Sequence, residues 1–456
     1  MPRASTRIAF VCQQCGADSV KWIGRCPNCD GWNTYVEERV VAPAKGRLES
    51  RAPRAPVALD EVPPDAEERI STGIGEFDRV LGGGVVRGSL VLLGGDPGIG
   101  KSSLLMHASA SLRDRGTVLY VSGEESAAQV KLRTRRFGID GRGIQLLAET
   151  DLASVVEAIR RVRPVFAVVD SIQTMSSDAI GSAAGGVSQL RECTARLLDL
   201  AKGEDVPIFL VGHVTKEGAV AGPRVLEHIV DAVLYLEGER FHAFRILRAT
   251  KNRFGSTDEV GVFEMADNGL REVSNPSQVF LEERTHGVPG SVVVPTLQGT
   301  RPLLVEFQAL VTPTSFGLPR RTANGTDLQR VILLLAVLAK RAGLSLGAHD
   351  VYVNLVGGLR IREPATDLGL AVAVASALRD RPADPRSVVL GELGLGGEVR
   401  RVQRLAARLR EAERLGFERA IVPAASAVDP GGTSLQVVGA SSLREALGAL
   451  GIADGP

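Results

Sequence analysis

Short apolar runs alternate with amphipathic segments along the chain between about residues 59 and 270. The apolar runs are rich in β-branched residues, and this alternation is typical of a parallel β-sheet whose strands are connected by helices. The pattern predicts strands at 89–93, 118–121, 165–169, 208–211, 233–236 and 244–248. It predicts helices at 101–113, 127–137, 152–161 and 187–202.

Two interruptions divide the chain into three regimes. Residues 38–58 contain several prolines and arginines and almost no large apolar residues, so they could not bury enough surface to offset their ordering entropy and form a linker. The second interruption is Ser274-Asn275-Pro276-Ser277. Beyond it, the pattern predicts a strand-like stretch followed by three helices, at 290–307, 327–342, 367–378 and 402–415.

A glycine-rich segment follows the first predicted strand of the sheet and opens a helix. It fits the P-loop pattern without a gap. Glycines let backbone N–H groups wrap around an anion, and the start of the helix faces the phosphates. Lys101 is expected to bind the β- and γ-phosphates of ATP, and the Ser102 hydroxyl to bind Mg²⁺. The predicted nucleotide-binding residues are Gly95, Asp96, Pro97, Gly98, Ile99, Gly100, Lys101, Ser102 and Ser103.

An acidic residue ends a second buried strand of the same pattern. The apolar run 165–169 leads directly into Asp170. Many buried strands end in aspartate, so this feature alone is a weak signal. Downstream of a P-loop in an α/β domain, however, a carboxylate at this place is expected to hold the Mg²⁺ ion of the nucleotide through water.

Two further segments resemble a known family. Residues 69–84 lead into the P-loop, and residues 251–255 read Lys-Asn-Arg-Phe-Gly. With a four-cysteine head and the C-terminal region, they resemble the RadA (Sms) family of bacterial DNA-repair ATPases, of which KNRFG is a hallmark. The likeness covers nearly the whole chain and implies an α/β fold with a RecA-like P-loop core. The implied parts are a C4 zinc ribbon at 9–36, a linker at 37–58, the ATPase domain at 59–272 and a Lon-protease-like α+β domain at 279–456.

Hydrolysis of ATP requires a base that orients the attacking water. Glu124 follows the strand after the P-loop helix, where RecA-like proteins keep a catalytic glutamate, and it matches that position best. Glu125 is the reserve candidate, although an exposed acid in the first turn of the next helix explains it equally well. His213 follows another strand and is expected to contact the γ-phosphate and report its loss. A histidine held by structural hydrogen bonds at a strand end is the alternative.

The family likeness also implies a homo-oligomeric ring, a hexamer, with ATP at the subunit interfaces. Lys251 and Arg253 then act on the nucleotide of a neighbouring subunit, where a cation stabilises the charge of the transferring phosphoryl group. A phosphate contact to DNA and an ordinary solvated basic turn are the alternatives, and action at the interface is favoured.

The activity that the resemblance implies is DNA-dependent ATP hydrolysis in recombinational DNA repair. A helicase of this kind moves on single-stranded DNA and migrates branched intermediates, so single-stranded DNA, branched DNA and the RecA recombinase are the expected partners. Candidate DNA-contacting loops span residues 173–188 and 215–224, where Lys216 and Arg224 would meet phosphates. Neither loop contains an aromatic residue for base stacking, so sequence-specific reading is not expected.

Four of the five cysteines lie within the first thirty residues, as the pairs Cys12-x-x-Cys15 and Cys26-x-x-Cys29. Four thiolates at this spacing suit tetrahedral Zn²⁺ in a structural site, and so short a segment needs the metal to fold. An iron–sulfur site or a redox pair are the alternatives. The fifth cysteine, Cys193, lies in a helical pattern and is expected to be a small buried residue.

The C-terminal likeness to Lon raises a rival function, ATP-dependent proteolysis. Lon-type chemistry needs a nucleophilic serine and a lysine that deprotonates it. In this chain the serine position falls on Ala365 and the lysine position on Ala406, so the domain is expected to be proteolytically inactive and to serve ring assembly, with DNA binding as a second candidate role. Thr366 has no nearby lysine to activate it. A basic helical face, of a kind that is usually only solvated, is formed by Arg400, Arg401, Arg404, Arg408 and Arg410.

Composition changes this picture little. The net charge of +1 over 456 residues neither requires nor excludes nucleic acid. The longest strongly apolar run, residues 331–339, is shorter than the ~20 residues of a membrane-spanning helix, and the N-terminus lacks the apolar stretch of an export signal. A cytoplasmic protein with no membrane partner is therefore expected. A nucleotide-dependent scaffold of the KaiC type shares the P-loop core and is the third hypothesis.

Overall fold

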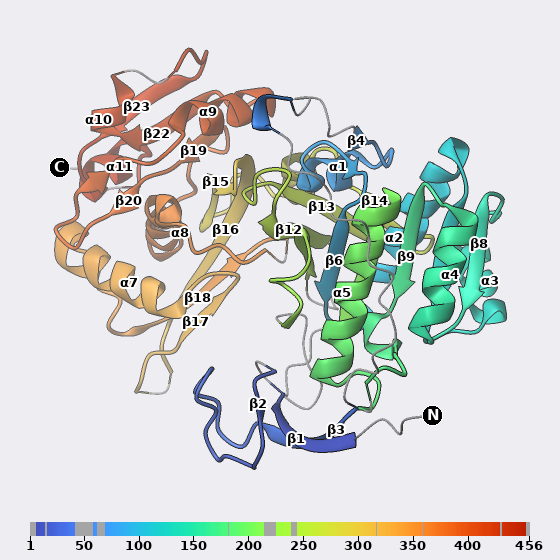
Figure 1. Ribbon diagram of the computed structural model, residues 1–456. Helices are drawn as coiled ribbons and strands as arrows, with labels where there is room; N and C mark the ends of the chain where they lie inside the picture. The colour runs from blue at the N-terminus through green and yellow to red at the C-terminus, as the bar shows by residue number, and fades with distance from the viewer. Residues whose placement is uncertain are drawn as a thin grey trace, which may run out of the picture. The chain divides into compact units, whose positions relative to one another are not determined.

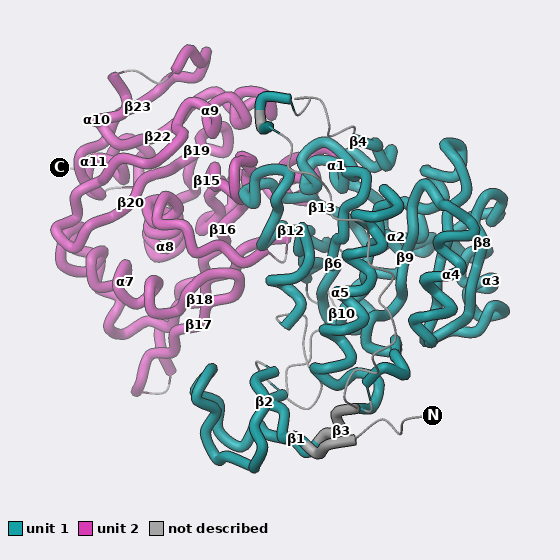
Figure 2. Tube along the Cα trace, in the orientation of Figure 1, with its two compact units in different colours: residues 1–273 teal, residues 274–456 magenta. Residues whose placement is uncertain are grey.

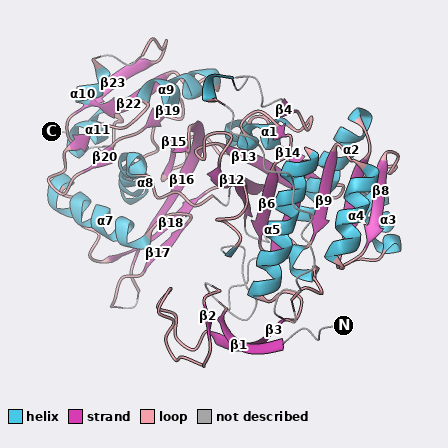
Figure 3. Cartoon of the chain, viewed as in Figure 1, coloured by secondary structure: helices cyan, strands magenta, loops and turns pink. Residues whose placement is uncertain are grey.

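The computed structural model describes residues 6–13, 16–41, 58–61, 69–180, 182–213, 225–238, 244–315, 317–357, 359–428 and 431–452. The chain forms two compact units, residues 1–273 and 274–456. Figure 1 colours the chain by residue number, and Figure 2 colours it by unit. Each unit is built around one large β-sheet with helices packed against it (Figure 3).

The sheet of the first unit has nine strands, of which six run parallel to one another. The remaining three form antiparallel hairpins at one edge. In spatial order the strands are β14 (Gly269–Glu272), β13 (Val260–Ala266), β12 (Phe244–Asn252), β11 (Ala232–Glu237), β6 (Leu90–Gly95), β10 (Ile208–His213), β9 (Phe166–Asp170), β7 (Val118–Ser122) and β8 (Ile144–Ala148).

Apolar side chains cover both faces of this sheet. On β6, Val91 and Leu93 belong to one buried cluster, whereas Leu90 and Leu92 belong to the other. Because successive strand residues point to opposite faces, a strand buried on both faces is a continuous apolar run. One face is covered by α1 (Gly75–Leu81), α2 (Lys101–Leu112) and α3 (Ala127–Arg136), and the other by α4 (Leu152–Val162) and α5 (Val187–Glu204).

The structure confirms the six predicted strands and four predicted helices of this unit to within a few residues. It adds α1, β8, β13 and β14, which the sequence pattern did not predict. Strand β8 lies at the edge of the sheet and is only partly buried, so it lacks the uniformly apolar run of a central strand. Cys193 is fully buried on α5, as expected.

Three short strands at the N-terminus form a small separate sheet in the order β2-β1-β3. Their bounds are β1 (Thr6–Cys12), β2 (Asp18–Ser19) and β3 (Tyr35–Val41). A two-stranded ribbon, β4 (Arg69–Ile70) with β5 (Val85–Val86), precedes the large sheet. A 3₁₀ turn spans Leu59–Glu61.

The sheet of the second unit has seven strands and mixes parallel with antiparallel pairs. In spatial order the strands are β17 (Arg321–Asn324), β18 (His349–Leu355), β16 (Arg301–Pro313), β15 (Ser291–Gln298), β19 (Ser387–Val389), β22 (Arg419–Pro423) and β23 (Gln436–Ala440). The helices are α6 (Pro276–Leu281), α7 (Leu328–Ala342), α8 (Asp367–Arg379), α9 (Leu405–Arg414), α10 (Ala424–Ala427) and α11 (Leu443–Ala449). A small hairpin joins β20 (Glu392–Leu393) to β21 (Val399–Arg400).

Two expectations for this unit are wrong in detail. The single strand-like stretch at 290–307 is an antiparallel hairpin, because the chain reverses at Gly299 and Thr300. Gly299 adopts a left-handed φ of 61°, which glycine tolerates readily, and a two-residue turn leaves little trace in an apolar pattern. Helix α9 begins at Leu405, three residues after the predicted start at 402.

The predicted basic helical face is also wrong. Arg408 is fully buried, and Arg400, Arg401 and Arg404 precede α9, with Arg400 in β21. The Arg408 guanidinium donates hydrogen bonds to the backbone oxygens of Pro295 (2.8 Å) and Gln403 (2.9 Å). It also forms an ion pair with Glu363, whose carboxylate accepts further bonds from Thr296 Oγ1 (2.8 Å) and the Leu297 backbone N–H (2.8 Å). The other four arginines of that face are exposed: Arg400, Arg401, Arg404 and Arg410. One turn of α9 is therefore anchored in the core by a charge that the sequence pattern placed in solvent.

Of the helices in the described part of the chain, none combines the length and the apolar character that a membrane span requires.

Replacing Arg408 by Met is expected to destabilise the protein strongly. The substitution leaves the partly buried Glu363 carboxylate without its cation and removes the buried guanidinium's hydrogen bonds to Pro295 and Gln403. Breaking a buried ion pair typically costs about 3–5 kcal/mol, and we expect a loss near the lower end because Glu363 is partly solvated. Arg410→Met, on the exposed side of the same helix, is the matched control and should change stability by less than about 0.5 kcal/mol. Urea denaturation of the full-length chain measures both, and equal midpoints would contradict the structural role of Arg408.

Candidate functional site

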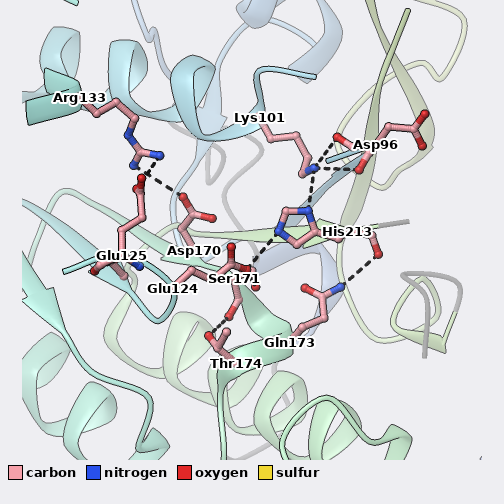
Figure 4. A network of polar contacts seen from close by, with 12 residues as sticks. Asp96, Lys101, Glu124, Glu125, Arg133, Asp170, Ser171, Gln173, Thr174 and His213 are labelled. Atoms are coloured by element: carbon pink, nitrogen blue, oxygen red, sulfur yellow. Dashed lines mark hydrogen bonds and ion pairs between the residues drawn. The ribbon is translucent and has the colours of Figure 1, made fainter. Parts of the chain in front are cut away.

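Polar side chains lie at or just beyond the carboxyl ends of four neighbouring strands, at the same edge of the large sheet. Strands β6, β10, β9 and β7 are neighbours and run parallel, so their carboxyl ends lie side by side. Gly95 is paired with His213, and Ser122 with Asp170, at these ends. The carboxyl edge of a parallel sheet is where such folds bind ligands. Figure 4 shows that Lys101, Glu124, Asp170 and His213 come together at this edge.

The P-loop is shaped by glycines in conformations that other residues avoid. Gly95 has a φ of 150°, and a Cβ there would lie 2.5 Å from the Leu236 carbonyl oxygen. Gly100, the residue before α2, has a φ of 115°, and its Cβ would lie 2.7 Å from Leu270 Cδ1. Any side chain at either position would clash with its neighbours. The chain therefore turns sharply from β6 into the N-terminus of α2, which starts at Lys101.

Lys101 is buried and lies against its own loop. Its Nζ donates hydrogen bonds to the backbone oxygens of Gly95 (2.8 Å) and Asp96 (3.0 Å) and to His213 Nδ1 (3.2 Å). Burial lowers the pKa of Lys101 to about 8, against the opposing effect of the Asp170, Glu124 and Asp96 charges. The Lys101 ammonium therefore lies within the electrostatic reach of both predicted catalytic carboxylates.

His213 connects Lys101 to Glu124. An ammonium group can only donate, so Nδ1 of His213 accepts from Lys101 and its Nε2 carries the proton. Nε2 then donates to Glu124 Oε1 at 3.1 Å. The Ser171 hydroxyl donates to the same oxygen. The hydrogen bond from His213, followed by that from Ser171, lowers the pKa of Glu124 to about 2 although burial opposes it. Glu124 is thus an ionised acceptor at neutral pH, as a base that orients water must be.

Glu125, the reserve candidate for the catalytic base, is engaged elsewhere. Its carboxylate forms an ion pair with Arg133 on α3, with 2.8 Å between Nη1 and Oε2. Figure 4 shows Glu125 directed toward Arg133, whereas Glu124 faces His213. The geometry therefore favours Glu124 as the base.

Asp170 and Ser102 fit a Mg²⁺ ion. Asp170 is almost completely buried at the end of β9, and its negative charge acts on Lys101 across the site. Ser102 follows Lys101 in the first turn of α2. Carboxylate and hydroxyl oxygens are the ligands that Mg²⁺ prefers, and a nucleotide phosphate would complete them.

Several residues of this cluster were not identified from the sequence: Tyr120, Arg133, Ser171 and Gln173. Tyr120 lies inside an apolar strand and looks like an ordinary core residue. Arg133 is one of several basic residues on α3. Only Ser171, directly after Asp170, carried a positional signal that sequence reasoning could have used.

Lys251 and Arg253 lie near the amino ends of the parallel strands, whereas the P-loop lies at the carboxyl ends of those strands. The end of β12 pairs with the start of β11, and the start of β11 pairs with the start of β6. Lys251 Nζ donates to the backbone oxygens of Glu227 (2.8 Å) and Val230 (2.7 Å), and Arg253 pairs with Asp231 at 3.2 Å. Four residues of β6, roughly 13 Å of extended strand, separate this end of the strand from Gly95. The two cations are therefore remote from the P-loop of their own chain.

The first predicted DNA loop is tied to the site by hydrogen bonds to His213 and Ser171, the latter accepted by the Ser171 backbone oxygen from Thr174 Oγ1 at 2.8 Å. Gln173 Nε2 donates to the backbone oxygen of His213 at 3.2 Å. Farther along the loop, the buried Gln189 accepts from the Ser177 N–H (2.9 Å) and donates to the Ile180 oxygen (2.9 Å). The second predicted loop, with Lys216 and Arg224, lies outside the described residues.

Three cysteines gather in the N-terminal ribbon. The sulfur atoms of Cys12, Cys26 and Cys29 all lie within 4.8 Å of one another, and the fourth predicted ligand, Cys15, lies outside the described residues. Two hydroxyls lie beside the sulfurs, Thr34 Oγ1 at 3.1 Å from Cys12 Sγ and Tyr35 OH at 3.6 Å from Cys26 Sγ. Cys12 Sγ donates to Thr34 Oγ1, and a hydroxyl beside a metal ligand is an outer-shell contact of that ligand. The donor set fits Zn²⁺.

Comparison with known proteins agrees with this geometry. Residues 10–37 match the family described as a rubredoxin metal binding domain, residues 59–219 an AAA domain, and residues 314–426 subunit ChlI of Mg-chelatase. The chain is 53% identical over 453 residues to the DNA repair protein RadA of Bacillus subtilis (strain 168), which covers 97% of this chain and 98% of that protein. It is 52% identical to the DNA repair protein RadA of Streptococcus pyogenes serotype M1, over 98% of this chain and 99% of that protein.

Among solved structures, a KaiC-like protein from Pyrococcus horikoshii OT3 matches with 20% identity and a TM-score of 0.38. The match covers 45% of this chain and 99% of that chain. The sequence relatives and the family matches together confirm the predicted fold class, a RecA-like α/β core with an N-terminal ribbon and a C-terminal Lon-like domain.

The ribbon is expected to bind one zinc ion per chain through its thiolates. Cys26→Ser should abolish stoichiometric zinc because it removes one of four ligands. Cys193→Ala, which alters the buried cysteine outside the ribbon, should leave the zinc content unchanged. Elemental analysis of the purified full-length proteins measures this. Iron in place of zinc, or full zinc in Cys26→Ser, would contradict the site.

Proposed function

The chain belongs to the family of the DNA repair protein RadA, and on that basis we propose that it is a DNA-dependent ATPase that moves along single-stranded DNA during recombinational repair. Membership of the family and the ATPase domain make it a DNA-repair ATPase. The finer activity, helicase action that migrates branched intermediates made by the RecA recombinase, is our inference. The cluster of Lys101, Glu124, Asp170 and His213 at one sheet edge is the observation that supports the ATP hydrolysis on which this inference depends.

The cluster assigns a role to each side chain. Lys101 and the N-terminus of α2 bind the β- and γ-phosphates of ATP, after Lys101 exchanges the loop carbonyls for phosphate oxygens. Ser102 and Asp170 hold Mg²⁺, which neutralises phosphate charge when it is bound. Glu124 orients the attacking water and accepts its proton. The other P-loop residues shape the cradle.

His213 is suited to report the state of the γ-phosphate. Its Nδ1 accepts from Lys101, so movement of Lys101 to a phosphate frees that nitrogen. Its backbone oxygen accepts from Gln173 in the loop at 173–188. A change at the phosphate is thereby transmitted to a loop that we propose contacts DNA.

Lys251 and Arg253 are proposed to act on the ATP of a neighbouring subunit. Their position at the opposite ends of the strands from the P-loop supports a trans role in a homo-oligomeric ring, a hexamer in our proposal. The contacts of Lys251 with Glu227 and Val230 also give it a structural role in the isolated chain. DNA contact remains the alternative for Arg253, whose side chain is half exposed.

Proteolysis is the weaker hypothesis for the C-terminal domain, residues 279–456. Ala365 and Ala406 stand where Lon-type chemistry needs a serine and a lysine. Thr366 is nearly buried, and its hydroxyl donates to the Glu363 backbone oxygen at 2.8 Å. We propose that this domain is inactive as a protease and serves assembly.

ATP hydrolysis with and without single-stranded DNA tests the proposed function. The wild type should be stimulated by DNA, and Lys101→Ala should lose about 10²–10³-fold of the rate because it removes a cation from the phosphate site. Hydrolysis that is indifferent to DNA would contradict a DNA-driven motor and favour a scaffold of the KaiC type. ATP-dependent degradation of casein would instead support the protease.

Glu124→Gln and Glu125→Gln separate the two candidate bases. Glu124→Gln should lower kcat by about 10²–10⁴-fold because it removes the base, while ATP binding is retained. Glu125→Gln is the matched control and should keep most of the activity, since Glu125 pairs with Arg133. Steady-state kinetics with a nucleotide-binding assay measures both. The reverse order of effects would overturn the assignment.

A further inference from the structure

Asp170 is held from behind by a residue of the neighbouring strand. Tyr120 lies in the middle of β7, and its hydroxyl donates a hydrogen bond of 2.5 Å to Asp170 Oδ2. The Tyr120 side chain is fully buried within the same apolar cluster as Phe166 and Phe209. Packing alone would be satisfied by phenylalanine at this place. The buried hydroxyl therefore requires a reason other than the core, because a buried polar group is costly unless it is hydrogen-bonded.

Arg133 of α3 determines which way that hydroxyl points. Its Nη2 donates to the Tyr120 hydroxyl oxygen at 3.2 Å, and the same nitrogen lies 3.9 Å from Asp170 Oδ2. A guanidinium only donates, so the tyrosine oxygen accepts from Arg133 and must direct its own proton to Asp170. Glu125 anchors the other side of the guanidinium at 2.8 Å. The result is an ordered chain of donors from Arg133 through Tyr120 to Asp170.

The chain of donors converges on one oxygen of the carboxylate. Tyr120 and Arg133 both approach Oδ2 of Asp170, so they constrain the rotation of the carboxylate from one side. The carboxylate so oriented would be available to hold Mg²⁺. Outer-shell hydrogen bonds of this kind orient metal ligands, and their removal typically costs about 10–100-fold in metal affinity.

We propose that Tyr120 and Arg133 are positioning residues of the Mg²⁺ site, which hold Asp170 in the rotamer that receives the metal–nucleotide complex. The inference rests on the proposed function, because it presupposes that Asp170 holds the Mg²⁺ of ATP. It goes beyond that function by adding two residues, on β7 and α3, which touch neither nucleotide nor metal.

The test is the Mg²⁺ dependence of nucleotide binding in full-length Tyr120→Phe. Binding of a fluorescent ATP analogue is titrated with Mg²⁺ and is measured separately in EDTA. The Mg²⁺ concentration for half-maximal binding should rise about ten-fold, because the carboxylate loses its fixed donor. Binding in EDTA should stay within about two-fold of the wild type, since Lys101 and the P-loop are untouched. A purely structural role would weaken both measurements together.

Tyr352→Phe is the matched control, because it makes the same chemical change in the second unit. Arg133→Met is the second variant, in case Tyr120→Phe does not fold as judged by circular dichroism. It removes the donor that directs the Tyr120 proton and should shift the Mg²⁺ requirement in the same direction, whereas Arg133→Lys, which keeps a donor, should shift it less.

The outcomes separate this inference from the proposed function. A wild type that binds the ATP analogue without any Mg²⁺ dependence would overturn the Mg²⁺ role of Asp170. If binding by the wild type depends on Mg²⁺, but Tyr120→Phe and Arg133→Met need the same Mg²⁺ concentration for half-maximal binding, the positioning role alone is overturned. Equal losses with and without Mg²⁺ would also overturn it, in favour of a structural role.

Discussion

Strands β6, β7, β9 and β10 pair in parallel and are buried on both faces, and the remaining features of the first unit depend on this arrangement. A strand covered on both sides presents its polar side chains to a ligand where it ends. Parallel pairing places those ends at one edge, so Lys101, His213, Asp170 and Glu124 meet although they are far apart in the sequence. The antiparallel addition of β12 carries Lys251 to the amino ends of the parallel strands.

Hydrogen bonds convert this meeting of side chains into a defined electrostatic state. Lys101 can only donate, so it sets the tautomer of His213, and the hydrogen bond from His213 lowers the pKa of Glu124. A second chain of donors runs from Arg133 through Tyr120 to Asp170. In a buried site an unpaired polar group is costly, which favours the arrangement in which these donors meet acceptors.

Buried charges also organise the second unit. The guanidinium of Arg408 joins α9 to the Pro295 carbonyl of β15 and to Glu363. Arg330 and Asp367 form a comparable pair between α7 and α8. Such pairs contribute little net stability over apolar residues, but breaking one is costly, so they specify how the helices are seated. The second unit has alanine at positions 365 and 406, and it contains these internal ion pairs.

The sequence by itself determined the features whose signal is local. The P-loop, with Lys101, and the apolar strand ending at Asp170 were predicted because backbone conformation and strand period are written into consecutive residues. The clustering of the N-terminal cysteines was predicted in the same way, from the spacing of the two cysteine pairs. The central parallel strands and the long helices of the first unit followed from their periodicity, whereas the partly exposed β8 and the turn at Gly299 did not, because their patterns are weak. The strands of the second unit beyond β16 were not predicted.

Only the tertiary structure decided which side chain meets which. Glu124 and Glu125 are adjacent and chemically identical, and the choice between them depends on His213 and Arg133, which are distant in the chain. Arg408 and Arg410 belong to one basic run, yet one is buried and the other exposed. Partners of this kind are selected by long-range packing. The physical reason is that a residue's charge is read from its own identity, whereas its role depends on the groups that folding brings within hydrogen-bond distance.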